Sequence, residues 1–321
     1  MILALAGGVG GARLAAGLAA ILPPDELAIV VNTGDDFVHF GLSISPDIDT
    51  VTYTLAGISN PDLGWGIAGE SWNFMDQIAR LGGETWFRLG DRDLATHVER
   101  TRRLRSGDSL TEITAALARA HGIAHPVVPM ADDPAPTIVH TDEGALAFQD
   151  YFVRRQCRPK LQRLDFAPHV APGAAFSTLI DDPALEAVVI CPSNPWLSIA
   201  PILALGGVRD RLRNRRVPIV GVSPIVGGKA VKGPAAKIMA ELGVAVSSAG
   251  VAGHYGDFLD GLVIHDTDRD EAAAFSNLRS LATNTLMKNA ADRAHLAAET
   301  VNWLRREWTG RPLVPISVTE V

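Results

Sequence analysis

Short apolar runs that end in small or polar residues recur along the chain, and each has the length of a buried strand. Unbroken apolar runs are typical of strands that are buried on both faces of a parallel sheet. The clearest are ILALAGG (2–8), LAIVVNTGDD (27–36), AVVICPSNP (187–195) and VPIVGVSPIVGG (217–228), with VAVSSAG (244–250) and LVIHDTD (262–268) as shorter candidates.

Helical patterns lie between or after these runs. They cover residues 12–22, 200–214, 233–243 and 291–308. Strands that alternate with helices predict an α/β fold with a Rossmann-like, doubly wound and mostly parallel sheet. Ligands of such sheets bind at the carboxyl ends of the strands, so we expect the functional residues in the loops that follow the strands.

The middle of the chain has a different pattern. Residues 70–122 carry three helical segments and little that reads as strand; Ser109 and Glu112 form a capping box and Gly122 ends that helix. We therefore expect a helical insertion over residues 61–125 that covers the carboxyl edge of the sheet. The basic run at 99–105 is predicted to be a solvated helix face.

Two further predictions concern organisation. Residues 137–153 alternate around a turn and predict a β-hairpin. We expect one α/β domain over residues 1–321, with C-terminal helices over 280–321.

Composition narrows the function classes. The chain has 29 Lys and Arg against 36 Asp and Glu, a formal charge of −7, which favours a small-molecule partner over nucleic acid. Cys157 and Cys191 show no metal-binding or C-x-x-C spacing, which fits a reducing cytoplasm. No run reaches the ~18 apolar residues that a membrane span needs. We expect a cytoplasmic protein with no membrane contact, and a homodimer as the commonest closed assembly.

Four glycines separate the first strand from the first helix. Backbone N–H groups in such a loop can bind an anion, and the positive end of the helix dipole reinforces the binding. The loop lacks the Lys-Ser/Thr of NTPase phosphate loops, and Arg13 stands where a dinucleotide fingerprint needs a small residue. Alternatively, the glycines only turn a tight corner. The expected phosphate-binding residues here are Gly7, Gly8, Gly10, Gly11 and Arg13.

Carboxylates gather in the next loops, where Asp35 and Asp36 are followed by Asp47 and Asp49. Acids that face an anion-binding loop would repel a phosphate unless a divalent cation lies between them, so we expect Mg²⁺. Asp36 and Asp49 are its expected ligands. The alternative for any one of these acids is that it caps a turn.

Three more stretches are candidates for binding. FRLGDRDLATH (87–97) either contributes to the site or fixes a helix start through ion pairs. Ser193 and Asn194 follow a buried strand and either cap a helix or bind a base or phosphate. Gly227, Gly228 and Lys229 resemble a second phosphate-binding loop.

Together these stretches resemble the 2-phospho-L-lactate transferase family of deazaflavin coenzyme F-420 biosynthesis, over roughly residues 1–270. The stretches are AGGVGGARLAAGL, VVNTGDDF, GLSISPDIDTVTYTLAG, WFRLGDRDLATH, PMADDP, FQDYFV, PSNPWLSIAPIL and VSPIVGGKAVKGPAAKIM. The resemblance implies transfer of a phospho-three-carbon acid from a GDP-linked donor to the ribityl hydroxyl of the deazaflavin FO. GMP is released with assistance from Mg²⁺.

The resemblance also implies site residues. It assigns FO binding to Asp49 and Arg88 in this sequence. We expect Asp49 to be the carboxylate nearest the chemistry, as metal ligand, base or FO contact. On sequence alone, Asp49→Ala should abolish transfer and leave thermal stability nearly unchanged.

Two other functions remain as alternatives. Gluconeogenesis-factor proteins, which resemble nucleotide-sugar-binding regulators, share the glycine-rich opening but lack the ISPDIDT and LGDRDLATH motifs. An NAD-dependent oxidoreductase is the other alternative. The three-carbon acid of the donor also stays open between 2-phospholactate, phosphoenolpyruvate and 3-phosphoglycerate.

Overall fold

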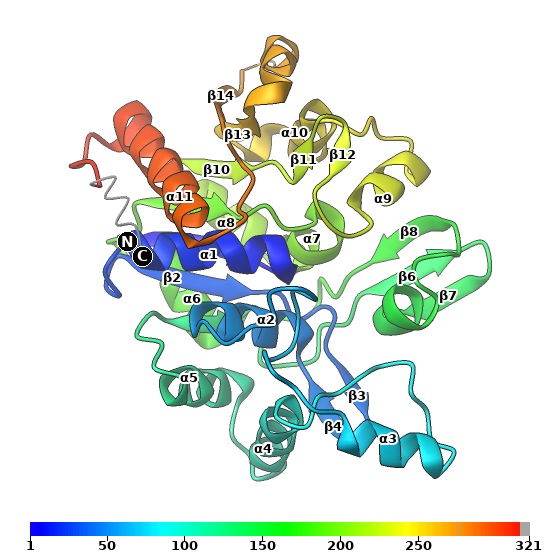
Figure 1. Ribbon diagram of the computed structural model, residues 1–321. Coiled ribbons are helices and arrows are strands. Elements are labelled where there is room, and N and C mark those ends of the chain that lie inside the picture. The colour runs from blue at the N-terminus through cyan, green and yellow to red at the C-terminus, as the bar shows by residue number, and fades with distance from the viewer. Residues whose placement is uncertain (276, 315–321) are drawn as a thin grey trace.

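The computed structural model describes residues 1–275 and 277–314, and its centre is a seven-stranded sheet (Figure 1). Its strands are β1 (Ile2–Ala6), β2 (Leu27–Val31), β5 (Val127–Pro129), β9 (Ala187–Ile190), β10 (Ile219–Val222), β13 (Gly261–His265) and β14 (Arg279–Thr283). They lie in the order β14-β13-β10-β9-β1-β2-β5, and all neighbours are parallel. The predicted Rossmann-like α/β class is confirmed.

Alternate residues of the strands face two separate cores. Ile2, Ala4 and Ala6 pack on one face against α1 (Gly8–Ile21), α2 (Pro46–Leu55) and α11 (Ala290–Leu304). Leu3 and Leu5 pack on the other face against α6 (Ala174–Asp181), α7 (Ala200–Ala204) and α8 (Val208–Asn214). The result is a three-layer α/β/α arrangement in which α1 and α11 lie side by side (Figure 1).

The strand order reverses between β1 and β9. From β1 the chain adds β2 and β5 on one side, and from β9 it adds β10, β13 and β14 on the other. Loops that leave two such strands diverge to opposite faces and open a crevice at the carboxyl edge. The loops after β1 and β9 therefore frame the expected binding position.

Helices α3 (Asn73–Arg80), α4 (Asp93–Arg105) and α5 (Leu110–Ala120) lie within residues 61–125. Ser109 and Glu112 form the predicted capping box, and Gly122 follows the end of α5 at φ 75°. A short hairpin that the sequence analysis did not predict, β3 (Phe37–His39) with β4 (Leu42–Ile44), packs against α3. Together they form a small apolar cluster of their own around Ile44, Met75 and Leu89.

The hairpin predicted within residues 137–153 is confirmed. It consists of β6 (Ile138–Thr141) and β7 (Gly144–Ala147), and β8 (Leu161–Asp165) pairs with the other side of β6. The remaining elements are β11 (Ile225–Val226), β12 (Lys229–Ala230), α9 (Ala235–Glu241), α10 (Ser248–Tyr255), the π-helical turns η1 (Asp150–Arg154), η2 (Pro195–Ile199) and η5 (Arg305–Thr309), and the 3-10 turns η3 (Gly256–Phe258) and η4 (Asp266–Ala274).

Two predicted elements differ in the structure. The strand predicted at 244–250 is wrong, because the Ser247 side chain accepts the Gly250 N–H and starts α10 instead. The segment from 280 begins within strand β14, ahead of the helix α11. Among the described residues, no helix has the length and apolar character to cross a membrane.

Candidate active site

A cavity of about 530 Å³ lies at the carboxyl edge, at the point where the strand order reverses. Its walls come from the loops after β1, β2, β9 and β10, from the start of α2 and from the insertion. Its size suits a small-molecule ligand. The residues on which the argument depends are Gly7, Gly8, Gly10, Arg13, Asp35, Asp47, Asp49, Trp86, Arg88, Gln149, Ser193, Asn194 and Lys232.

The glycine loop joins the two halves of the sheet. The Gly7 N–H donates to Ser193 Oγ at 3.0 Å, and the Gly8 N–H donates to Asp47 Oδ1 at 2.7 Å. A side chain on Gly10 would collide with the backbone oxygen of Pro192, and one on Gly11 would collide with Ser193. The glycines are therefore needed for close packing between loops, and the first two already use their N–H groups within the protein.

Other predicted phosphate-binding residues reach the cavity differently. Gly8 and Gly10 line it, whereas Gly11 does not. Arg13 lines it and donates from Nη1 to the Met287 carbonyl at 3.1 Å. Asn194 Oδ1 accepts the Trp196 and Leu197 N–H groups and caps η2, while its buried Nδ2 has no partner among the described residues.

The loop at 227–229 lies outside the cavity lining. Gly227 and Gly228 form the turn of the β11–β12 hairpin at φ 55° and 71°, the backbone conformation that tight hairpin turns require of glycine. The Gly227 N–H donates to the Asp268 carboxylate, and Lys229 is exposed. Lys232, three residues further along, lines the cavity instead.

Asp47 and Asp49 stand in the first turn of α2, where Pro46 starts the helix. Pro is favoured at a first helical position, and carboxylates there complement the helix dipole. Two residues apart on a helix, the carboxylates do not share a face. Asp47 points toward the glycine loop, and Asp49 points toward α4.

Asp47 belongs to a buried acidic cluster. The Asn32 Nδ2 group donates to Asp47 Oδ2 at 2.9 Å and to Asp35 Oδ1 at 3.3 Å. Burial raises the pKa of Asp47 to about 6, against hydrogen bonds from Asn32, Gly8 and Ser198. Burial, together with the charge of Asp47, raises the pKa of Asp35 well above its usual range. Among the described residues, no lysine or arginine forms an ion pair with Asp35 or Asp47.

Asp36 adjoins this cluster without lining the cavity. Its Oδ2 accepts a hydrogen bond from Ser45 Oγ at 2.7 Å, and its buried Oδ1 has no partner among the described residues. Burial raises the pKa of Asp36 well above its usual range despite the Ser45 hydrogen bond.

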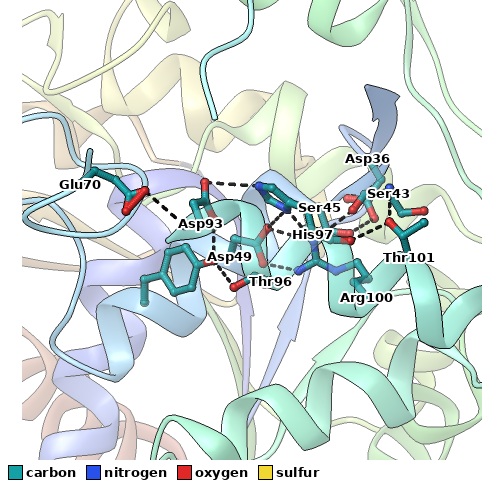
Figure 2. Close-up of polar contacts among 11 residues, drawn as sticks. Asp36, Ser43, Ser45, Asp49, Glu70, Asp93, Thr96, His97, Arg100 and Thr101 are labelled. Carbon is teal, nitrogen blue, oxygen red and sulfur yellow. Dashed lines mark hydrogen bonds and ion pairs between the residues drawn. The ribbon is translucent and has the colours of Figure 1, made fainter. Parts of the chain in front are cut away.

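Asp49 belongs to a second buried network, which Figure 2 shows. Both of its oxygens accept hydrogen bonds from Arg100, with Nη1 at 3.1 Å from Oδ2. His97 lies between two carboxylates, with Nδ1 3.6 Å from Asp49 and Nε2 3.3 Å from Asp93. The Tyr53 hydroxyl donates to Asp93 at 2.6 Å. The network ties the start of α2 rigidly to α4.

The predicted solvated face at 99–105 is wrong for Arg100, which is 1% exposed. A signal was present in the sequence. Arg100 follows Asp93 by seven residues and His97 by three, so all three share one helix face. The other arginines of the run divide between solvent and surface ion pairs, as with Arg102 and Glu99.

The two aspartates of the LGDRD stretch have different roles. Asp91 accepts the N–H groups of Asn73 and Phe74 and caps α3, and these bonds together with Ser71 lower the pKa of Asp91. The Glu70 carboxylate accepts the N–H groups of Arg92 and Asp93 and holds the start of α4. Asp91 therefore fixes a helix start, whereas Asp93 and His97 face the buried network.

Arg88 lies at the rim of the cavity on the insertion side. Its guanidinium stacks over the Trp72 ring, with Cζ 3.9 Å from the ring centroid. The side chain is exposed and, among the described residues, forms no ion pair. Trp86 and Phe87 line the cavity beside it. This rim offers aromatic surface together with one positive charge.

Comparison with known proteins identifies a family that covers nearly the whole chain. A family profile described as 2-phospho-L-lactate transferase CofD matches residues 2–307. A 2-phospho-L-lactate transferase from Methanosarcina mazei is 39% identical over 293 residues, 91% of this chain and 96% of that one. A phosphoenolpyruvate transferase from Kitasatospora aureofaciens is 40% identical over 307 residues, 92% of this chain and 95% of that one.

A solved structure shares the fold. The crystal structure of a UPF0052 family member from Bacillus halodurans superposes with a TM-score of 0.60 at 14% identity, covering 94% of this chain and 98% of that one.

Proposed function

Because the chain belongs to the 2-phospho-L-lactate transferase CofD family, we propose that it transfers a phospho-three-carbon acid from a GDP-linked donor to the terminal ribityl hydroxyl of the deazaflavin FO. This reaction belongs to the biosynthesis of coenzyme F-420. Relatives named for 2-phospho-L-lactate and for phosphoenolpyruvate are about equally similar, so both acids are candidates. The observation that carries the proposal is that the glycine loop, Asp49 and Arg88 share one cavity.

The glycine-loop side suits the nucleotide diphosphate. Arg13 and Lys232 supply positive charge, and the positive end of the α1 dipole faces the same space. The unpartnered Nδ2 of Asn194 is a further donor at this wall. These groups would stabilise the negative charge that collects on GMP as it leaves.

The insertion side suits FO. The aromatic ring system of a deazaflavin matches the surface of Trp86 and Phe87, and Arg88 supplies a cation at its edge. Asp49 would then accept a hydrogen bond from the attacking hydroxyl. Because both of its oxygens already accept from Arg100, Asp49 is better suited to orient the hydroxyl than to remove its proton.

In the reaction, the terminal ribityl oxygen forms a bond to the phosphorus that carries the three-carbon acid. The bond from that phosphorus to the bridging oxygen breaks, and GMP leaves with that oxygen and its electron pair. The hydroxyl proton is lost to solvent or to a carboxylate of the acidic cluster. Positioning and charge stabilisation account for most catalysis in such transfers.

We propose Mg²⁺ as the cofactor, and the acidic cluster fits it better than Asp49 does. Asp35 and Asp47 are buried carboxylates bridged by Asn32 and unpaired with any cation among the described residues, whereas the charge of Asp49 is already balanced by Arg100. Asp36 would add negative charge beside Asp35. When bound, Mg²⁺ supplies charge neutralisation for the diphosphate.

The function is tested by incubating the protein with FO, Mg²⁺ and each GDP-linked acid in turn, followed by mass spectrometry. We expect one donor to give a phospho-acid ester of FO and one equivalent of GMP. If no donor gives an ester while the protein is folded, the transferase assignment is lost.

Replacing Arg88 with alanine should weaken FO binding roughly 10-fold and leave GDP binding unchanged, because it removes the cation beside the aromatic rim. The intrinsic fluorescence of the deazaflavin reports FO binding. Arg80→Ala, which removes an exposed arginine of α3 outside the cavity lining, is the matched control and should change neither affinity. An unaltered FO affinity in Arg88→Ala would remove Arg88 from the acceptor site.

Magnesium should raise the melting temperature at about pH 7.5 and have little effect at about pH 5. The pKa of Asp47 is raised to about 6 in the folded protein, so its ionisation destabilises the metal-free fold as pH rises through that value. A cation reverses this loss only where the cluster is ionised.

The control for the magnesium effect is a pair of variants followed by thermal denaturation. Asp47→Asn should abolish the magnesium-dependent rise, and Asp76→Asn, at an exposed position on α3, should keep it. An identical rise in both variants would place the cation elsewhere.

A further inference from the structure

Gln149 lines the cavity and has a side-chain oxygen that is unpartnered within the part of the chain that the structure describes. The residue is 4% exposed and lines the cavity beside Phe148 and Phe152. Its Nε2 donates to the backbone carbonyl of Asp35 at 3.0 Å. Its Oε1 is buried and, among the described residues, has no hydrogen-bond partner.

The orientation of this amide is fixed by its neighbour. A backbone carbonyl can only accept, so the NH₂ end of Gln149 must face Asp35 and the oxygen end must face away from it. A buried acceptor that stays unpaired is costly, and such groups in folded proteins usually meet a ligand or water. Gln149 thus presents a hydrogen-bond acceptor of known position.

The chemistry of the substrates limits what this oxygen can bind. The diphosphate and the acid of the donor carry only acceptor oxygens when ionised, and an amide oxygen repels them. Hydroxyl and N–H groups can donate, and they occur on the ribityl chain and ring of FO and on the ribose and guanine of the nucleotide. Gln149 is therefore suited to a donor group of FO or of the nucleoside and unsuited to the reacting phosphate.

We propose that Gln149 is a substrate-binding residue whose Oε1 accepts a hydrogen bond from a hydroxyl or N–H group of FO or of the nucleoside. The inference rests on the proposed function for the identity of the substrates. The ribityl chain of FO is the first source, because the contact to Asp35 places Gln149 beside the acidic cluster that the proposed function assigns to the diphosphate, which the ribityl hydroxyl attacks. The nucleoside is the second source.

The test measures dissociation constants for FO by fluorescence and for GDP by calorimetry. Gln149→Met keeps the side-chain length and removes the acceptor, and we expect roughly 10- to 100-fold weaker binding of one ligand with the other unchanged. Gln149→Asn withdraws the amide by one methylene. This variant should also bind that one ligand more weakly and leave the affinity for the other unchanged. Loss for FO assigns the contact to FO, and loss for GDP assigns it to the nucleotide.

Thr137→Val is the matched control. Thr137 is 1% exposed, has a buried unpartnered hydroxyl and contacts the same loop through its N–H bond to the Gly34 carbonyl, but it does not line the cavity. The control should bind both ligands as the wild type does. Unchanged binding in both Gln149 variants, or equal losses in Gln149→Met and Thr137→Val, overturns the inference. A wild-type protein that binds neither ligand instead refutes the proposed function.

Discussion

Replacing Arg100 with methionine is expected to lower the free energy of unfolding by about 3–5 kcal/mol and to abolish transfer. Arg100 is 1% exposed and binds both oxygens of Asp49. Its removal leaves the Asp49 carboxylate buried without its counter-charge, and the carboxylate also loses the contact that fixes its direction. Urea denaturation and the FO transfer assay measure the two effects.

A double variant separates stability from chemistry. Asp49→Leu combined with Arg100→Met removes both charges, and replacing a buried ion pair by apolar residues is often neutral for stability. We expect this protein to be more stable than either single variant and still inactive. The four proteins form a double-mutant cycle whose coupling energy measures the ion pair. If Arg100→Met unfolds at the wild-type urea concentration, the pair has no structural role.

The same ion pair revises what the sequence alone suggested for Asp49. A carboxylate in an exposed loop could be replaced by alanine at little cost in stability. In the structure, Asp49→Ala strands the buried guanidinium of Arg100, which costs about as much as the reverse change. Loss of activity in Asp49→Ala therefore identifies a catalytic role only if the remaining folded fraction is measured.

Local sequence patterns predicted five strands of the parallel sheet, β1, β2, β9, β10 and β13, because each lies in a mostly apolar run. They failed at 244–250, where a similar apolar run is followed by Ser247, whose capping bond is a matter of local geometry. Strand β14 was not predicted from the sequence, because RSLAT is short and only half buried at the edge of the sheet. Edge positions place few demands on composition, so their sequences are weak predictors.

Sequence patterns pointed to candidate site residues where several polar side chains stand close together in one motif. The acids after β2 and in the first turn of α2 were recognised, but their division between two networks was not. That division depends on Asn32 and Arg100, which approach Asp47 and Asp49 from 15 and 51 residues away in sequence. The spacing of Arg100 from Asp93 and His97 indicates a shared helix face, but it does not show which distant residue that face contacts. The glycines show the same limit, because the closest neighbours of Gly10 and Gly11 come from the loop after β9, and Asp47 of α2 is closest to Gly7 and Gly8.

Replacing Gly10 with alanine should destabilise the protein by about 3 kcal/mol and reduce transfer roughly 100-fold. The added methyl group would collide with the backbone carbonyl oxygen of Pro192, and a backbone atom cannot rotate away as a side chain can. Relief requires the loop after β9 to move away from α1. That movement displaces Ser193 from the Gly7 N–H and opens the junction that holds both halves of the cavity.

Gly253→Ala is the matched control for this substitution, since Gly253 lies in helix α10 with no described heavy atom within 4 Å of an added Cβ. Alanine has the higher helix propensity, so this variant should gain about 0.5–1 kcal/mol and keep its activity. If the glycine loop served only as a source of N–H groups for phosphate, Gly10→Ala would keep those groups and spare both stability and turnover. A loss of stability in Gly10→Ala, measured without ligand, thus separates a packing role for the loop from an anion-binding role.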